Sequence, residues 1–456
     1  MNKMALMAAL FVLGGTAFAD LPSIPYNAEA VDISLPTIPG RTFVITDYGA
    51  VADDKTLNTS AFASAIAACK AAGGGRVVVP AGEFLTGPIE LVSRMDLHLE
   101  KNALVRFSDD PALYGAPSVH NPGGDDDAET RSMMAPISGS GLIDIAITGQ
   151  GTIDGNGKAW WVRGVRKFRA DGKPAEAPLP RPILIHLTKC KRVLLENLTL
   201  CNSPQFHVVP NECDGVICRN LKIVAPPLSP NTDGIDPSNS RNVLITRCMI
   251  DCGDDNVSFK AWRDENNKIT APTENITVTD CTFLHGHGVS VGSRVWSGVR
   301  NILVDQCTFD GTGNGIRIKS ARDRGGVMEN ITYSNITMKN VGTAITINTH
   351  YFDHTKGSKP VTPETPIVRN VRIRNVTVTG AGTAGDITGL PEMPVSDVVM
   401  ENVVIACQTG MQIKDAKDIE FRGVQIKAKT GKRLTLENVE VKGIESFSDT
   451  TPGPAR

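Results

Sequence analysis

From about residue 193 onward, short stretches alternate apolar and polar residues around a central Asn or Cys, as in VLLENLTL and ITYSNITM. The central positions are Asn197, Asn220, Cys248, Cys281, Cys307, Asn335, Asn375 and Asn402, with a shortened last copy at Asn438. From 197 to 402, successive central positions lie 23 to 40 residues apart. Alternation with period two predicts strands, and its recurrence at this spacing is typical of a solenoid.

Two kinds of solenoid fit such a repeat. A leucine-rich repeat also carries an Asn after alternating Leu, but it has a tight period, whereas here the period varies and Val, Ile and Thr dominate. These residues favour strands in every coil. We therefore predict an all-β chain, a single right-handed parallel β-helix, in which equivalent residues of adjacent coils stack about 4.8 Å apart.

The central residues lead to two further expectations. The Asn side chains are predicted to form an internal ladder that satisfies backbone groups at a turn. Cys248, Cys281 and Cys307 are expected to stack in the same row as small buried fillers.

The predicted domain organisation has three parts. Residues 1–19 read as a secretory signal, with Lys3, an apolar run and Ala17-Phe18-Ala19 as the cleavage site. Residues 20–444 are assigned to the β-helix, and the Ser/Thr/Pro-rich residues 445–456 to a disordered tail. Within the β-helix we expect a helix over 58–72 that caps its open end, first strands in 76–84, and a long loop over 155–180.

The composition of the chain limits the classes of partner that the protein is expected to bind. The chain has 456 residues, 41% of them hydrophobic, and a net charge of -2. Without a basic field nucleic acid is not expected, and no later segment has the about 20 apolar residues of a membrane span. Among ten cysteines, Cys213 with Cys218 and Cys248 with Cys252 are disulfide candidates, although spacing leaves the connectivity open. No Cys/His cluster has zinc-site spacing, so no metal is expected.

Four short stretches bring titratable residues into consecutive coils: NTDG (231–234), GDD (253–255), GHG (286–288) and RIK (317–319). Aligning the coils puts Ile235, Val257, Val289 and Ile316 in one row, and hence Asp233, Asp255, His287 and Asn314 in one column. Asp254 is expected to point another way from the same coil. Arg317 and Lys319 face outward if Ile316 and Ile318 face the core. A one-residue slip would break this arrangement.

Each stretch has an ordinary interpretation when taken alone. Asp-Gly steps and GDD are common in turns, His287 lies between glycines, and RIK suits a solvated strand face. Their matching positions in consecutive coils favour a site. Clustered carboxyls suit glycoside hydrolysis, because like charges raise one another's pKa and keep one group protonated. Arg317 and Lys319 suit a substrate carboxylate, so a uronic-acid polymer is favoured over a neutral one.

NTDGIDP, GDDNVSFK, GHGVSVGS and GNGIRIKS resemble the four signature segments of the polygalacturonases, the pectin-cleaving glycoside hydrolases of family 28. The likeness covers roughly residues 42–440 and includes segments similar to bacterial endopolygalacturonases. It implies a right-handed β-helix, single-displacement hydrolysis with inversion, and no cofactor.

The same resemblance implies roles for single residues. Asp254 is the general acid, Asp233 and Asp255 activate the water, and His287 supports the protonation of the acid. Arg317 and Lys319 bind the galacturonate carboxylate, and Asn231 orients neighbouring groups. One departure is Arg294, where close bacterial members usually carry Glu; an extra cation beside the cleft would strengthen the binding of a polyanionic substrate or alter the subsite preference.

Several alternatives stay open. A rhamnogalacturonan hydrolase shares the fold but usually lacks the second GDD aspartate, the GHG histidine and the RIK pair. An exo-acting polygalacturonase differs mainly in loops, such as 112–140 and 155–180. A calcium-dependent pectate lyase or a non-catalytic polysaccharide-binding β-helix would use the acidic column for calcium. We expect an exported, secreted or periplasmic monomer that degrades polygalacturonate and contacts neither membrane nor nucleic acid.

Overall fold

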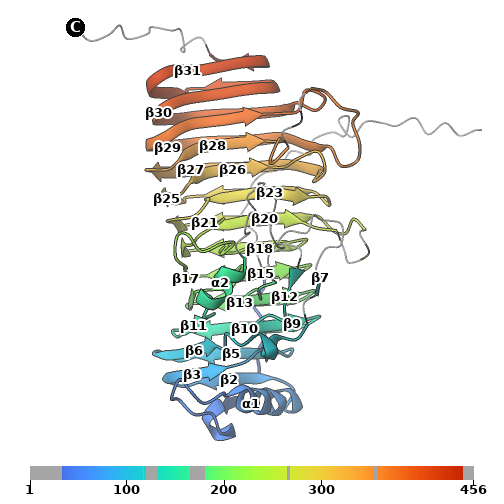
Figure 1. Cartoon of the computed structure of the whole chain (residues 1–456), viewed down its shortest axis with the longest axis vertical. Helices are drawn as coiled ribbons and strands as arrows, with labels where there is room; N and C mark the ends of the chain where they lie inside the picture. Colours follow the sequence, from blue (N-terminus) through green and yellow to red (C-terminus); the bar gives the residue numbers. More distant parts are fainter. Residues whose placement is uncertain are drawn as a thin grey trace, which may run out of the picture.

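The computed structural model describes residues 33–444 apart from 117, 120–130, 165–179, 264–265, 267, 354 and 356. It shows a right-handed parallel β-helix whose coils stack along the long axis of the molecule (Figure 1). The predicted fold class is therefore confirmed. The proposed leader at 1–19 and the tail at 445–456 lie outside the described residues and stay predictions.

The strands stack in three columns, one for each face of the helix. The first column contains β1 (Thr42–Val44), β2 (Gly75–Val79), β5 (Met95–Leu99), β10 (Ile143–Gly149), β13 (Lys191–Glu196), β16 (Asp214–Arg219), β18 (Arg241–Thr246), β21 (Thr273–Thr279) and β24 (Val299–Asp305). The second contains β3 (Gly82–Thr86), β6 (Ala103–Phe107), β11 (Thr152–Asp154), β14 (Thr199–Cys201), β17 (Lys222–Val224), β19 (Met249–Asp251), β22 (Thr282–Phe283) and β25 (Thr308–Asp310). The third contains β4 (Ile89–Glu90), β9 (Ile137–Ser140), β12 (Ile185–Thr188), β15 (Val208–Asn211), β20 (Val257–Ala261), β23 (Val289–Val295), β26 (Asn314–Lys319) and β28 (Thr343–Asn348).

The C-terminal coils are longer and continue through the corners. They are β27 (Gly326–Lys339), β29 (Pro366–Thr388), β30 (Val395–Arg422) and β31 (Gln425–Lys442). The remaining elements are the antiparallel pair β7 (Ser118–Val119) and β8 (Arg131–Ser132), the helices α1 (Thr59–Ala71) and α2 (Lys158–Gly164), and the 3-10 turns η2 (Ile45–Tyr48) and η3 (Pro111–Tyr114).

Helix α1 closes the N-terminal end of the stack, as the sequence predicted (Figure 1). Its inner face carries Phe62, Ala65 and Ile66, which are buried in the main core and cover the first coil. Strand β1 precedes the helix and pairs with β2, so the first strand of the β-helix begins before the predicted segment 76–84. Helix α2 begins the expected 155–180 loop, of which residues 165–179 lie outside the described part.

The sequence analysis aligned Cys248, Cys281 and Cys307 with the central Asn residues of the other repeats, and this alignment was wrong by one position. Strand pairing aligns Leu221 with Cys248, because Lys222 and Ile223 pair with Met249 and Ile250. The cysteines therefore belong to the buried row one residue after the Asn row. They stack with one another, the Cys248 backbone N–H donating to Cys281 Sγ at 3.4 Å.

The Asn row itself lies outside the core. Its residues adopt the left-handed conformation, with φ between 52° and 63°. They are Asn197, Asn220, Arg247, Asp280, Gln306, Asn335, Asn375 and Asn402, whereas Asn438 lies opposite Asp415 in another row. Asn tolerates positive φ better than most residues, which explains its recurrence at this corner. The exposed amides bond one another, for example Asn220 Nδ2 to Asn197 Oδ1 at 2.7 Å. The prediction of an internal ladder to the backbone was wrong.

All ten cysteines are free thiols, so neither disulfide candidate is formed. No helix in the described part of the chain is both long and apolar enough to cross a bilayer.

The hydrophobic core runs through the coils as continuous rows. One row contains Ile235, Val257, Val289, Ile316 and Ile345, each with no exposed surface.

Stacked core aromatics provide a test of how the coils support one another. The rings of Phe283 and Phe309 lie 4.9 Å apart between centroids, and neither side chain is exposed. We expect Phe309→Ala to lower the free energy of unfolding by about 3–5 kcal/mol, since it removes buried surface and leaves a cavity. Urea unfolding followed by circular dichroism measures this change. Leu228→Ala is the control, because Leu228 is 95% exposed and should leave the midpoint in place. Equal midpoints for both variants would contradict the packing.

Candidate active site

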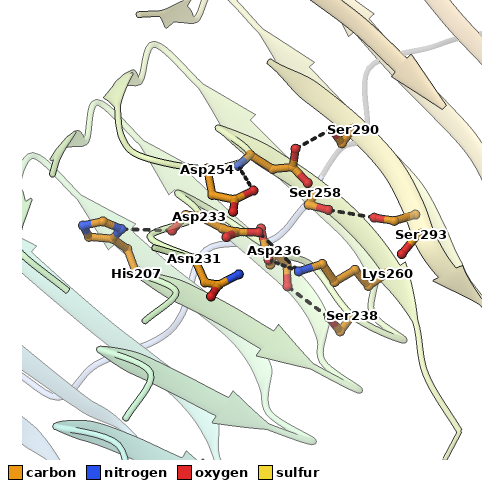
Figure 2. A network of polar contacts seen from close by, with 12 residues as sticks. His207, Asn231, Asp233, Asp236, Ser238, Asp254, Ser258, Lys260, Ser290 and Ser293 are labelled. Carbon is orange, nitrogen blue, oxygen red and sulfur yellow. Dashed lines mark hydrogen bonds and ion pairs between the residues drawn. The ribbon is translucent and has the colours of Figure 1, made fainter. Parts of the chain in front are cut away.

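The strand register brings the predicted column together. Ile235 pairs with Val257, Val257 with Val289, and Val289 with Ile316. The residues two positions earlier, Asp233, Asp255, His287 and Asn314, therefore lie in four successive coils. The carboxyls of Asp233, Asp254 and Asp255 each place one oxygen within 4.8 Å of the other two. Figure 2 shows the side chains of Asp233 and Asp254 next to each other, just before Ile235 and β20 in their coils.

Two outward-facing rows of the third column supply the surrounding polar groups. The first row contains Asp236, Ser258, Ser290 and Arg317, next to the inward row of Ile235 and Val257. The second contains Ser238 and Lys260, followed after a bulge in β23 by Lys319. Because alternate residues of a strand face opposite ways, the buried Ile316 and Ile318 turn Arg317 and Lys319 outward, as predicted.

Asp255 is held by two cations. Lys319 Nζ lies 2.8 Å from Asp255 Oδ2, and Arg317 Nη1 lies 3.1 Å from Asp255 Oδ1. The Ser290 hydroxyl donates to the same Oδ1 at 2.7 Å. Burial alone would raise the pKa of Asp255, but the charges of Lys319 and Arg317 outweigh it and hold that pKa well below its usual range. Asp255 is therefore a carboxylate throughout the ordinary pH range.

Asp233 is equally buried but is held by a single cation. Lys260 Nζ lies 3.3 Å from Asp233 Oδ2 and 2.8 Å from Asp236 Oδ2 (Figure 2). Burial raises the pKa of Asp233 well above its usual value, against the charge of Lys260, and Asp236, Asp254 and Asp255 raise it further. Burial likewise raises the pKa of Asp236 to about 6, with Lys260 opposing. The two members of the column thus have opposite tendencies to hold a proton.

Asp254 and His287 are half-buried and reach the surface above the two buried aspartates. Asp254 Oδ1 accepts from the backbone N–H of Asp255 at 2.9 Å, and its carbonyl oxygen accepts from the backbone N–H of His287 at 2.9 Å. His287 Nδ1 is buried and has no hydrogen-bond partner among the described residues. The structure therefore ties His287 to Asp254 through the backbone.

Steric constraints explain why glycines flank His287 on both sides. Gly286 and Gly288 have φ of 119° and 72°. A Cβ on Gly286 would lie 2.4 Å from the carbonyl oxygen of Asp254, and one on Gly288 would lie 2.3 Å from that of Asn314. Only glycine allows this close approach of three coils.

Asn231 lies at the edge of the site in the left-handed conformation, with φ of 52°. Its Oδ1 accepts from Arg181 Nη2 at 2.7 Å, while Arg181 Nη1 donates to the carbonyl oxygens of Pro204 and Pro230. Arg181 is 1% exposed and fastens the segment that leads into Asp233. Its role was missed, because its partners come from distant coils.

Lys260, Asp236 and Ser290 were also missed by the sequence analysis. Their outward direction follows from the alternation that placed Arg317 and Lys319, so the signal was present in NVSFK and NTDGID. Tyr351 was missed too; its ring centroid lies 5.1 Å from Lys319 Nζ and 5.6 Å from the Arg317 guanidinium. Arg294 was expected to act as an extra cation for the substrate, but it is 2% exposed and lies over the Trp262 ring.

The arrangement suits proton chemistry at a glycosidic bond. It combines a buried permanent carboxylate, a buried carboxyl with high proton affinity and a half-exposed carboxyl within 4.8 Å. Three cations, Lys260, Arg317 and Lys319, already compensate the buried pair. A metal ion at the three carboxyls would have to displace or oppose these charges.

Comparison with known proteins agrees with the fold and identifies the family. The model of the family described as Glycosyl hydrolases family 28 matches residues 69–428. The chain is 32% identical over 403 residues to an endo-polygalacturonase of Pectobacterium carotovorum subsp. carotovorum, covering 86% of this chain and 93% of that relative. Among solved structures, the hyperthermoactive exopolygalacturonase from Thermotoga maritima has a TM-score of 0.72 at 29% identity, over 90% of this chain and 93% of that one. The polygalacturonase from Erwinia carotovora ssp. carotovora has a TM-score of 0.67 at 30% identity, over 90% and 99%.

The chain belongs to glycosyl hydrolase family 28. It is a glycoside hydrolase, and the resemblance to polygalacturonases that its four signature segments indicated is confirmed.

The ion pair of Lys319 with Asp255 predicts a pH-dependent loss of stability. The folded pKa of Asp255 lies below its unfolded value of about 3.9, so the pair contributes stability above that pH and loses it as the pH falls. Lys319→Met should cost about 3–5 kcal/mol at pH 7, because it breaks a buried pair. Without Lys319 the pKa of Asp255 rises, so the deficit relative to wild type should shrink as the pH falls below about 4.

Thermal midpoints of both proteins between about pH 2 and 7 measure this difference. Lys414→Met is the matched control, since Lys414 pairs with Glu437 at an exposed position and should change the midpoint little at any pH. A deficit for Lys319→Met that stays constant over this range would contradict the ion-pair assignment.

Proposed function

We propose that this protein is an exported hydrolase that cleaves α-1,4 bonds between galacturonic acid units of demethylated pectin, within the chain rather than from its end. The observation that carries this proposal is the union of three carboxyls within 4.8 Å with Arg317 and Lys319 from neighbouring coils. The acids supply proton transfer, and the cations select a sugar that carries a carboxylate. The endo-polygalacturonase relative and the polygalacturonase structures support the same substrate.

Asp254 is the proposed general acid. It is the half-exposed member of the three, so its carboxyl is the one that a leaving glycosidic oxygen can reach. Its Oδ1 accepts from the backbone N–H of Asp255, which fixes the direction of the carboxyl. His287 stands beside it and supports its protonation.

Asp233 and Asp255 are the proposed pair that holds and deprotonates the attacking water. Two carboxylate oxygens no more than 4.8 Å apart can share one water, because each hydrogen bond spans about 2.8 Å. Attack by that water opposite to the leaving oxygen gives single displacement with inversion. An inverting site separates its acid and base carboxyl groups by roughly 6.5–9.5 Å, more than the nearest-oxygen limit here, so product stereochemistry is a necessary test.

Arg317 and Lys319 are the proposed ligands of the galacturonate carboxylate. Each spends one hydrogen bond on Asp255, and guanidinium and ammonium groups carry five and three donor hydrogens. Donors thus remain for a substrate carboxylate while Asp255 stays neutralised. Asn231, fixed by Arg181, orients neighbouring groups at the edge of the site.

Export rests on the leader-like residues 1–19, action without a cofactor rests on the resemblance, and the monomeric state rests on the capped end of the β-helix. A calcium-dependent lyase or a calcium-binding polysaccharide receptor is less favoured, because three cations already surround the carboxyls that calcium would need. A rhamnogalacturonan hydrolase is less favoured too, since the GHG histidine and the RIK pair are both in the site.

Replacing the proposed acid should stop turnover without unfolding the protein. We expect Asp254→Asn to lower kcat on polygalacturonic acid by about 10²–10⁴-fold, the usual contribution of general acid catalysis, with an unchanged thermal midpoint. Asp251→Asn is the control: Asp251 ends β19 three residues earlier, is also half-buried and bonds His285. Reducing-end assays measure both variants. Activity of Asp254→Asn near that of the wild-type protein would exclude Asp254 as the general acid.

The products report both the cleavage pattern and the stereochemistry. On polygalacturonic acid with EDTA, we expect an early ladder of saturated oligomers and no rise in absorbance at 235 nm. Proton NMR during the first turnovers should show new reducing ends in the β configuration, since the α bond is inverted. Release of monomer or dimer alone would make the enzyme exo-acting, retained α ends would exclude single displacement, and a loss of activity with EDTA would favour a calcium-dependent lyase.

A further inference from the structure

Lys260 is a buried cation for which the proposed reaction has so far no use. It is 4% exposed and faces outward from β20 into the space beneath the acidic column. Its ammonium group contacts Asp233 and Asp236 and lies 4.0 Å from the centroid of the Phe206 ring. An ammonium group taken so fully from water requires compensation by its partners.

The charged groups that face Asp233 come from three coils. Asp236 lies on its own coil; Asp254, Asp255 and Lys260 come from the next. His207, from the preceding coil, is hydrogen-bonded through Nδ1 to the carbonyl oxygen of Asp233. Burial lowers the pKa of His207 to about 4, so its ring is neutral at higher pH and supplies no cation.

The cations of the following coils serve the other member of the column. Arg317 and Lys319 bond Asp255, as described above. Within the described part of the chain, Lys260 is the cation paired with Asp233, and Asp236 competes for it at the shorter distance of 2.8 Å against 3.3 Å.

We propose that Lys260 is a positioning residue that favours the ionised form of Asp233 against the effect of its burial, so that Asp233 is available for proton abstraction, and that Asp236 moderates this effect by sharing the same ammonium group. The inference rests on the proposed role of Asp233 as part of the base. It adds two residues that do not touch the reacting atoms but determine the pH range in which the base is available.

The arrangement predicts shifts of opposite sign in the acidic limb of the pH profile of kcat/KM, which reports the ionisation of the free enzyme. Lys260→Met removes the cation, so Asp233 takes up its proton at higher pH and the limb should move up by about one pH unit or more. Asp236→Asn removes a like charge and releases Lys260 to Asp233, so the limb should move down. Lys260→Arg keeps the charge and should restore most of the wild-type position.

The experiment is the pH dependence of kcat/KM on polygalacturonic acid for these three variants and the wild-type protein. Arg369→Met is the matched control, because Arg369 is also buried but pairs with Glu329 across β29 and β27. A general loss of packing would lower activity at every pH and leave the limb in place, as expected for this control. Thermal midpoints identify a variant that does not fold; if Lys260→Met fails, the downward shift in Asp236→Asn must still occur.

The inference is overturned if folded Lys260→Met or Asp236→Asn keeps the wild-type limb, or if both variants move it in the same direction. Asp233→Asn separates this outcome from failure of the proposed function. Loss of activity in Asp233→Asn together with unmoved limbs would reject the role of Lys260 alone. Full activity in Asp233→Asn would instead reject Asp233 as part of the base, and with it the need for Lys260.

Discussion

The register between parallel coils is the constraint on which the rest of this structure depends. Backbone hydrogen bonds between coils place equivalent residues about 4.8 Å apart, and the buried apolar rows prevent any coil from sliding by one residue. A slip of one position would turn Val257 and Val289 to the solvent and the titratable residues into the core. The same hydrophobic contacts that stabilise the fold therefore also determine which side chains meet at the surface.

Within this register the charges are divided unequally. Two buried carboxyls lie in adjacent coils, yet one has two cations and a hydroxyl while the other shares one cation with a third carboxyl. The net charge of the chain is only -2, so the binding of a polyanion relies on these local cations rather than on a general positive field. Proton affinity in the site is thus a property of the few residues that each carboxyl touches.

The sequence was informative wherever the chemistry follows from alternation. The rows through Ile235, Val257, Val289 and Ile316, the column from Asp233 to His287, and the outward RIK cations all required only period two and a common register. The sequence analysis placed the central Asn and Cys residues in one row, although they belong to two adjacent rows. The Asn residues lie at the corner between two strands, and the Cys residues are the inward-facing residues that follow this corner. Alternation alone does not show which of two neighbouring residues forms the corner. Lys260 and Asp236 had the right spacing but no visible partner, since an ion pair between coils is apparent only once the coils are stacked. Arg181 was inaccessible to such reasoning, because it fastens backbone oxygens that carry no sequence signal.

The free thiols have a consequence for the chemistry of the protein outside its site. Burial raises the pKa of Cys218 and Cys252 well above its usual value, and that of Cys201 to about 12. Thiolate is the species that oxidants and disulfides react with, so these groups are inert while the coils stay stacked. Since none of the ten cysteines is bonded, the native state contains no disulfide that a reductant could break. Oxidation of the buried thiols then requires the coils to separate first. The rate at which these thiols are oxidised is therefore a measure of how often the coils separate.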